Sequence, residues 1–134
     1  MYRVLSNGSH TLTAYKSNNN RGLGFDVHFG DVLVSGMHDR IAMTGYPGDK
    51  ECVVDRFYID RNYRRSKEHH GSSAMSLLLS MYGVAGTSVM YVTNATAEGR
   101  PFYIGNGFEQ DPMGNLIIRF TDSIIKPSPP MVKY

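Results

Sequence analysis

Alternating apolar and polar positions dominate the first half of the chain and predict short β-strands there. The alternating runs lie at residues 2–5, 24–29, 31–35 and 41–44. Asn7 and Gly8 follow the first run, and an Asn-Gly pair is typical of a tight hairpin turn. Residues 15–24 are polar and rich in glycine, so we expect them to form a mobile loop rather than a packed element.

From Cys52 onward the alternation continues, but both faces of the run carry apolar and polar side chains. The two faces are Val53, Asp55, Phe57 and Ile59 on one side and Val54, Arg56 and Tyr58 on the other. A strand covered on both sides of a sheet shows this kind of mixture. We therefore expect a central strand that is covered on both of its faces.

A helical spacing of apolar residues follows over residues 74–81, with Ser72 or Ser73 as the N-cap and Gly83 just past the end. Next come a buried strand at 89–92, a short helix that begins at Pro101, and strands at 108–110 and 116–120. The predicted order after residue 52 is therefore β, α, β, α, β, β. Residues 123–134 are rich in proline and predict an extended C-terminal tail.

Composition narrows the class of protein. With 134 residues, of which 41% are hydrophobic, the chain is expected to form one domain with its own core. A net charge of +2 is too small to imply a polyanionic partner. A single cysteine, Cys52, allows no intrachain disulfide and is expected to be a small buried thiol. No apolar run reaches the length of a membrane span, so we expect no membrane association and a cytoplasmic location.

Basic side chains gather where the strand that starts at Cys52 gives way to the helix. Arg64, Arg65 and Lys67 precede Gly71 and the serines that follow it. Backbone N–H groups at a helix start attract anions, and basic side chains strengthen the attraction. The spacing matches neither a Walker loop nor a dinucleotide fingerprint. A phosphate site and a solvated basic turn both stay open on this pattern alone.

Two stretches together resemble the GNAT N-acetyltransferase superfamily. Ile59-Asp60-Arg61-Asn62-Tyr63-Arg64, followed by Gly71-Ser72-Ser73 and a leucine-rich helix, resembles its acetyl-CoA-binding motif. Asn94, Ala97 and the run from Tyr103 to Phe108 resemble the next motif of the family. The chain departs from the family at Arg61, where a proline is usual, and in a slightly longer loop that lacks one glycine.

The resemblance implies a fold of the α/β (α+β) class: a central mixed, mostly antiparallel β-sheet that is splayed in the middle, with helices on both faces. It implies one GNAT-like domain over residues 1–134. Within it we expect a shortened N-terminal part at 1–50, an acetyl-CoA-binding core at 51–122 and the tail at 123–134.

The resemblance also implies an acetyl-CoA-dependent N-acetyltransferase that moves an acetyl group to a primary amine by direct transfer in a ternary complex. Acetyl-CoA is then the cosubstrate, no metal is expected, and the amine acceptor is a small molecule or a protein. The implied cofactor-binding residues are Phe57, Tyr58, Ile59, Arg64, Arg65, Lys67, His70, Gly71, Ser72, Ser73, Asn94 and Tyr103.

Tyr103 is the expected general acid. A phenol, with a pKa of about 10, can protonate a departing thiolate of pKa about 8 to 9. The other interpretation of Tyr103 is an aromatic residue packed beside Phe102 and Phe108. Asp55 is the candidate general base, although it is equally interpreted as a surface or ion-paired carboxylate.

Other bases stay open as well, namely Glu51 on the same strand face as Asp55 and two histidines nearer the N-terminus, His28 and His38.

Two alternatives to an enzyme remain, and the oligomeric state is also open. The first alternative is a GNAT-fold protein without turnover that acts by binding another protein. The second is a nucleic-acid surface formed by the basic residues between Arg56 and Lys67, which Asp60 and Glu68 dilute, so we do not favour it. Exposed strand edges and the proline-rich tail also leave a homodimer open.

Overall fold

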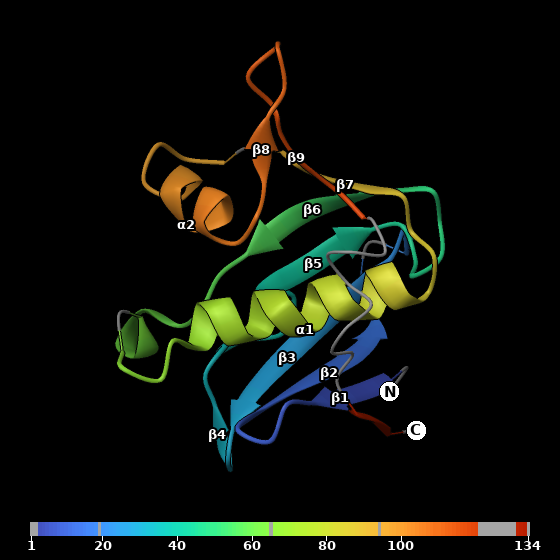
Figure 1. Ribbon diagram of the computed structural model, residues 1–134. Helices are drawn as coiled ribbons and strands as arrows, with labels where there is room; N and C mark the ends of the chain where they lie inside the picture. Colours follow the sequence, from blue (N-terminus) through green and yellow to red (C-terminus); the bar gives the residue numbers. More distant parts are fainter. Residues whose placement is uncertain (1–2, 19, 65, 94, 121–130, 134) are drawn as a thin grey trace.

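A computed structural model describes residues 3–18, 20–64, 66–93, 95–120 and 131–133 (Figure 1). In this part the chain is a mixed α/β fold with one open, mostly antiparallel sheet. Its strand order is β10-β1-β2-β3-β5-β6-β7-β9-β8, with β4 paired to β3 off this path. The strands are β1 (Arg3–Ser6), β2 (His10–Lys16), β3 (Leu23–Phe29), β4 (Val32–Leu33), β5 (Ile41–Thr44), β6 (Glu51–Phe57), β7 (Val89–Val92), β8 (Glu109–Gln110), β9 (Leu116–Arg119) and β10 (Met131–Lys133). The helices are the 3-10 turn η1 (Arg61–Tyr63), α1 (His70–Val84) and α2 (Arg100–Gly105).

The N-terminal strands form as their alternation predicts. β1 and β2 pair antiparallel around Asn7 and Gly8, so the predicted hairpin is confirmed. Gly8 has a φ of 96°, a conformation that glycine adopts without strain. The strands predicted at 24–29 and 41–44 are also confirmed, whereas only Val32 and Leu33 of the run at 31–35 form a strand.

The loop predicted at 15–24 was placed too wide. β2 continues through Lys16 and β3 begins at Leu23, with Tyr15 opposite Gly24 and Lys16 opposite Leu23. Pairing between neighbouring strands orders the polar ends of the predicted loop, which local composition does not reveal. Tyr15 is fixed further because its hydroxyl accepts the backbone N–H of Asp39 at 2.6 Å.

One face of the sheet is packed by α1, which lies across β1 and β2 and in front of β3 (Figure 1). Apolar side chains of this helix meet the strands, as Tyr82 does with Phe25 at a ring-centre distance of 6.5 Å. The largest side chains that are almost fully buried are Tyr82, Phe25, Phe108, Leu5, Leu12, Leu23, Ile41, Met43, Met75, Leu77, Leu78 and Met81. Burying an aliphatic or phenylalanine side chain of this size contributes about 1.5–3 kcal/mol relative to leaving it exposed.

Both predicted ends of α1 were wrong. The helix begins at His70, and its N-cap is His69 in the left-handed conformation (φ 51°) without a side-chain cap. Ser72 and Ser73 therefore lie inside the first turn. The helix also passes through Gly83 and ends at Val84, since packing of the apolar face overrides the helix-breaking tendency of glycine.

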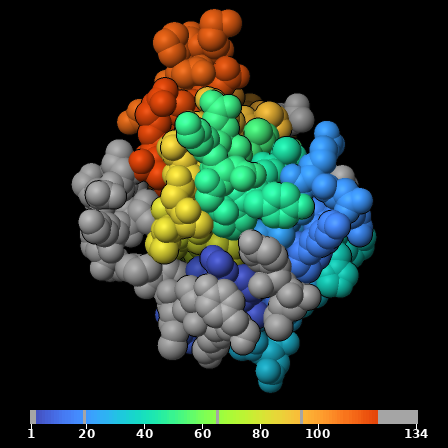
Figure 2. Space-filling view, turned by 90° about the vertical axis from the view of Figure 1, so that its right-hand side faces the viewer, coloured from blue at the N-terminus to red at the C-terminus, as the bar shows by residue number. Residues whose placement is uncertain are grey.

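The second half follows the predicted order of elements. β7 forms at 89–92 as expected, and α2 has a proline in its first turn. β8 and β9 pair antiparallel and form a hairpin that projects from the body of the molecule (orange in Figures 1 and 2). Within the described residues α2 is only six residues long and packs against β9 and Phe57 of β6, so helices cover less of the sheet than the resemblance implied.

The expected tail at 123–134 needs correction where the structure describes it. β10 pairs antiparallel with β1, placing Lys133 opposite Val4 and Met131 opposite Ser6. These residues are therefore a strand of the sheet. The remainder of the predicted tail, at 123–130 and 134, lies outside the described residues.

Candidate functional site

β6 and β7 separate part of the way along their length. They are parallel and pair from Glu51 opposite Val89 to Val54 opposite Val92. They are the only parallel neighbours among the strands of the described residues. β7 ends there, whereas β6 runs on to Phe57 and stays paired with β5 on its other side. The edge of β6 that faces β7 therefore has no strand partner beyond Val54.

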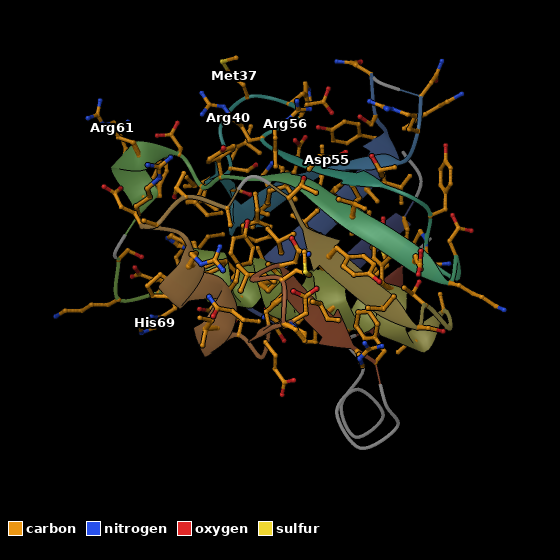
Figure 3. The ribbon with its side chains drawn as sticks, turned by 90° about the horizontal axis from the view of Figure 1, so that it is seen from above. Met37, Arg40, Asp55, Arg56, Arg61 and His69 are labelled. Carbon is orange, nitrogen blue, oxygen red and sulfur yellow. The ribbon has the colours of Figure 1, made fainter. Side chains whose placement is uncertain are left out.

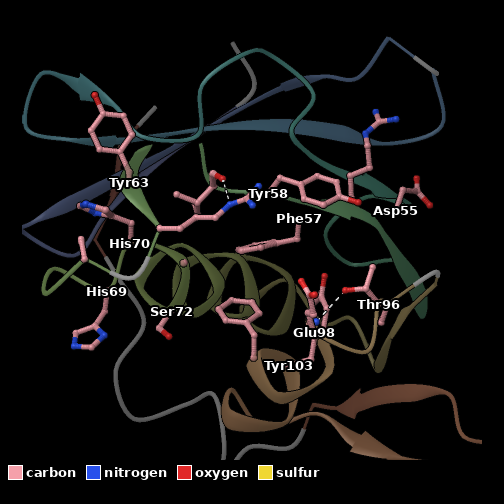
Figure 4. A pocket seen from close by; sticks show the side chains of 18 of the residues that line it. Asp55, Phe57, Tyr58, Tyr63, His69, His70, Ser72, Thr96, Glu98 and Tyr103 are labelled. Carbon is pink, nitrogen blue, oxygen red and sulfur yellow. Dashed lines mark hydrogen bonds between the residues drawn. The ribbon is translucent and has the colours of Figure 1, made fainter. Parts of the chain in front are cut away.

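A cavity of about 440 Å³ opens at this separation. Its walls come from the end of β6, the loop and first turn of α1, the segment after β7, and α2. Figure 4 shows Asp55 and Tyr58 of the β6 segment on one side and Tyr103 of α2 on the other. A central strand, a helix start and a tyrosine thus meet at one opening.

The first turn of α1 forms one wall through Gly71 and Ser72. A Cβ atom on Gly71 would lie 3.1 Å from Cε1 of Phe102, so a larger residue here requires the Phe102 ring to shift by a few tenths of an ångström. Backbone N–H groups in the first turn of a helix have no partner within the helix, and the helix dipole is positive there. This wall is suited to an anionic group.

Arg64 connects the loop to the end of β6. Its Nε donates to the carbonyl oxygen of Ile59 at 2.8 Å, and both residues line the cavity. In Figure 3, His69 lies at the periphery of the molecule, at the outer end of the loop. The hydrogen bond fixes the path of the chain between β6 and η1, and it occupies one of the donors of the guanidinium.

Most of the predicted cofactor-binding residues come together in this cavity. Those that line it are Phe57, Tyr58, Ile59, Arg64, His70, Gly71, Ser72 and Tyr103. Lys67 and Ser73 do not line it, while Arg65 and Asn94 lie outside the described residues. The two sequence stretches, far apart along the chain, therefore meet at one place.

Tyr103 is both a packed aromatic and a cavity residue. It is 7% exposed and makes edge contacts with Phe102 and Phe108 at ring-centre distances of 5.4 and 5.5 Å. Burial raises its pKa to about 12, with a smaller contribution from the nearby hydroxyl of Tyr58. Among the described residues its hydroxyl has no hydrogen-bond partner. The phenol is therefore protonated at every physiological pH.

Asp55 lines the same cavity and is held in place by β5. The hydroxyl of Thr44 donates to its Oδ2 at 2.6 Å. The other base candidates, Glu51, His28 and His38, are not part of the cavity wall. His38 instead lies 3.1 Å from the carboxylate of Asp26. Of the bases considered, Asp55 is the one that shares a cavity with Tyr103.

Sequence reasoning missed other residues of the cavity wall. Thr93, Thr96, Glu98 and Phe102 line it, and the first three flank the motif positions Asn94 and Ala97 in the sequence. The hydroxyl of Thr96 accepts the N–H of Gly99 at 2.9 Å and so shapes the entry to α2. The resemblance assigned a binding role to Asn94 and Tyr103 and gave none to these neighbours.

His70 behaves differently from what its place in the loop suggested. Its imidazole is 5% exposed, and its Nδ1 lies 2.7 Å from Nε2 of His10, on β2. Burial lowers the pKa of His10, the proximity of His70 lowers it further, and Glu68 opposes both effects. This pair spans 60 positions of the chain, so no local pattern could have revealed it.

Cys52 is buried, as expected, and lies away from the cavity. Burial raises its pKa to about 11. Its Sγ donates weakly to the carbonyl oxygens of Tyr46 and Asp49 at 3.5 and 3.8 Å. A protonated thiol in such a position is inert as a nucleophile.

No protein-family model matches the chain, and no curated protein matches it. Among the helices of the described residues, none is long and apolar enough to cross a bilayer. Within the same residues no group of three or more His, Cys, Asp or Glu side chains is placed to hold a metal ion.

Proposed function

We propose that the protein is an acetyl-CoA-dependent N-acetyltransferase of the GNAT type, with the splayed sheet and the helices on both faces that this family has. The observation that carries the proposal is the cavity where β6 and β7 separate, because it joins an anion-attracting helix start to a buried phenol. The two motifs that resemble the family supply residues to both of these walls.

The cavity offers a place for the pyrophosphate, the pantetheine arm and the thioester of acetyl-CoA. The N–H groups of the first turn of α1, with Gly71 and Ser72, suit the pyrophosphate. The edge of β6 beyond Val54 has backbone groups without a strand partner, and these suit the amides of the pantetheine arm. Phe57 and Ile59 add apolar surface beside that edge. The thioester then lies between β6 and α2.

Transfer proceeds in one step in this proposal. The neutral amine attacks the thioester carbonyl carbon, the C–N bond forms and the C–S bond breaks. Asp55, directly or through a water molecule, accepts the proton that the amine loses, and Tyr103 supplies a proton to the departing sulfur. A backbone N–H on the free edge of β6 stabilises the negative charge that develops on the carbonyl oxygen.

Binding and turnover are tested separately. Acetyl-CoA at about one hundred times its dissociation constant should stabilise the folded protein by about 2.7 kcal/mol, which a thermal melt reports. Release of free thiol from acetyl-CoA, measured against a panel of small amines and peptides, reports turnover. Absence of both stabilisation and thiol release across the panel would remove the proposal.

A GNAT-type protein without turnover, which acts by binding another protein, is the second candidate. The observation in its favour is the raised pKa of Tyr103, about 12, because a general acid is most effective when its pKa lies near the operating pH. Stabilisation by acetyl-CoA without thiol release from any acceptor selects this candidate.

A nucleic-acid surface is less well supported. Arg56 donates through Nε to the carbonyl oxygen of Asp39 at 2.8 Å, and Arg64 donates to Ile59. Both guanidinium groups thus use part of their donor capacity within the protein. Binding of RNA that weakens steeply with salt would revive this interpretation.

A further inference from the structure

Two buried imidazoles meet at the start of α1, where one of them, His70, is part of the cavity wall. His10 on β2 and His70, the first residue of α1, are 1% and 5% exposed. Their nearest ring nitrogens are 2.7 Å apart. Phe29 contacts both rings at about 5 Å, and Tyr63 of η1 contacts His70. The chemistry proposed above uses neither imidazole.

The surrounding hydrogen bonds assign the protons of the pair. Oδ1 of Asn7 accepts the backbone N–H groups of Ser9 and His10 at 3.1 and 2.8 Å, which fixes the orientation of that amide. The Ser9 hydroxyl donates to the same oxygen at 3.1 Å. In the arrangement where each of these contacts is a hydrogen bond, Ser9 Oγ accepts from Nδ1–H of His10 at 2.8 Å. Neutral His10 then has a bare Nε2, which accepts Nδ1–H of His70.

This assignment leaves one place for a further proton. Nε2 of His70 is bare, and a proton added there keeps every hydrogen bond of the network. A second proton would have to enter at Nε2 of His10 and break the bond between the rings. Of the described charged or titratable groups, Glu68 and Tyr63 interact with the pair from the preceding loop and from η1. Glu68 favours the protonated form.

We propose that His10 and His70 are a positioning pair for the anion site at the start of α1. His10 holds the first residue of the helix against β2, and His70 takes up one proton when an anionic ligand binds to the neighbouring turn. The inference rests on the proposed function only in naming that ligand as the pyrophosphate of acetyl-CoA. Protonation adds positive charge beside the ligand without disturbing the N–H groups that hold it.

The test measures the affinity for 3′-dephospho-coenzyme A between pH 8 and pH 6 by calorimetry in two buffers of different ionisation enthalpy. This ligand keeps the pyrophosphate and lacks the terminal phosphate that itself titrates near neutral pH. Uptake of about one proton per ligand should strengthen binding by up to about tenfold for each unit of pH decrease. A wild-type affinity that does not change with pH overturns the proposal.

Two variants separate positioning from protonation. In His70→Asn the side-chain amide can still donate to Nε2 of His10 but has no nitrogen that protonates, so its affinity at pH 6 should equal its own affinity at pH 8. In His10→Leu the tether is lost, and binding should weaken at every pH. Circular dichroism establishes that each variant is folded. A His70→Asn variant with the wild-type pH slope overturns the proposal.

A second probe keeps the outcome separate from the proposed function. If neither acetyl-CoA nor 3′-dephospho-coenzyme A binds, the proposed function fails, and sulfate, which does not titrate in this range, replaces them. Long-range ¹⁵N NMR of the imidazoles should then show His70 Nε2 protonating at higher pH with sulfate than without it. An unchanged titration of His70 in sulfate overturns the inference as well.

Discussion

Replacing Tyr103 by phenylalanine tests the proton-donor role against a purely packing role. The ring contacts with Phe102 and Phe108 survive the change, because only the hydroxyl is removed. The pKa of Tyr103 is about 12 and that of a free thiol about 8.5, so full proton transfer to the thiolate is uphill by about 5 kcal/mol. The hydroxyl therefore acts mainly as a hydrogen-bond donor to the sulfur in the transition state.

This role sets the size of the expected effect. General acid catalysis contributes about 10² to 10⁴ in rate, and the uphill transfer places Tyr103 at the lower end. We expect Tyr103→Phe to lower kcat by about 10²-fold and to leave the affinity for acetyl-CoA within about threefold of wild type. The wild-type kcat should show no loss from tyrosine ionisation up to pH 10, since the phenol stays protonated.

The same substitution makes a prediction about stability. The Tyr103 hydroxyl belongs to a cavity-lining residue, is not fully buried and has no hydrogen-bond partner among the described residues, so removing it should change the free energy of unfolding by less than about 0.5 kcal/mol. Tyr82→Phe is the matched control, because the Tyr82 hydroxyl donates to the carbonyl of Gly45 at 3.1 Å, away from the cavity. The free energy of unfolding of Tyr82→Phe should be about 1 kcal/mol lower than that of the wild type, and its turnover should equal that of the wild type.

Thiol-release kinetics and urea unfolding of the two variants provide the measurements. Full turnover in Tyr103→Phe, with any acceptor that the wild type acetylates, would refute the donor role. A loss of stability in Tyr103→Phe would show that its hydroxyl is satisfied in the folded protein.

Three further predictions follow from single groups. Gly71→Ala should weaken acetyl-CoA binding while the protein stays folded, because the new Cβ lies 3.1 Å from the Phe102 ring. Ser73→Ala is the control, since Ser73 does not line the cavity. Equal affinities of the two variants for acetyl-CoA would contradict the expectation. Cys52, with a pKa raised to about 11 by burial, should react with iodoacetamide at pH 8 at least about a hundredfold more slowly in the folded protein than in urea, and equal rates would be inconsistent with that burial. Burial lowers the pKa of His10 below 6.5, so as the pH falls His10 is protonated in the unfolded chain before it is protonated in the folded protein. Tm should therefore fall as the pH drops below about 6.5, and it should fall less in His10→Gln. Parallel pH profiles of Tm in the two proteins would show that His10 is not the cause.

Local pattern predicted the elements well where one strand or helix carries its own signal. The run at 89–92 and the hairpin at Asn7 and Gly8 form as expected, since apolar alternation and turn chemistry act over a few residues. The start of α1 was misplaced because the N-cap is His69 in the left-handed conformation without a side-chain hydrogen bond, whereas the sequence pattern indicates a serine cap.

Features that depend on distant pairing were out of reach. β10 forms by pairing with β1, and His70 is held by His10. In both cases the partner lies far away in the sequence, so no local pattern indicates it. The candidate site was predicted in its main parts, because Tyr103 and the Gly71 turn lie in recognisable motifs. Its acidic and hydroxyl-bearing wall after β7, including Glu98, was not predicted, since these residues lie beside the motif positions Asn94 and Ala97 rather than at them.

The edge strand pair β1 and β10 has a practical consequence for engineering. Val4 lies opposite Lys133, so the two ends of the described chain run side by side. A short linker between them, with new termini opened in the projecting turn between Gln110 and Leu116, gives a circular permutant that keeps every strand pairing except that of β8 with β9. In such a permutant a fluorescent reporter can be attached close to α2 without disturbing the sheet edge formed by β1 and β10.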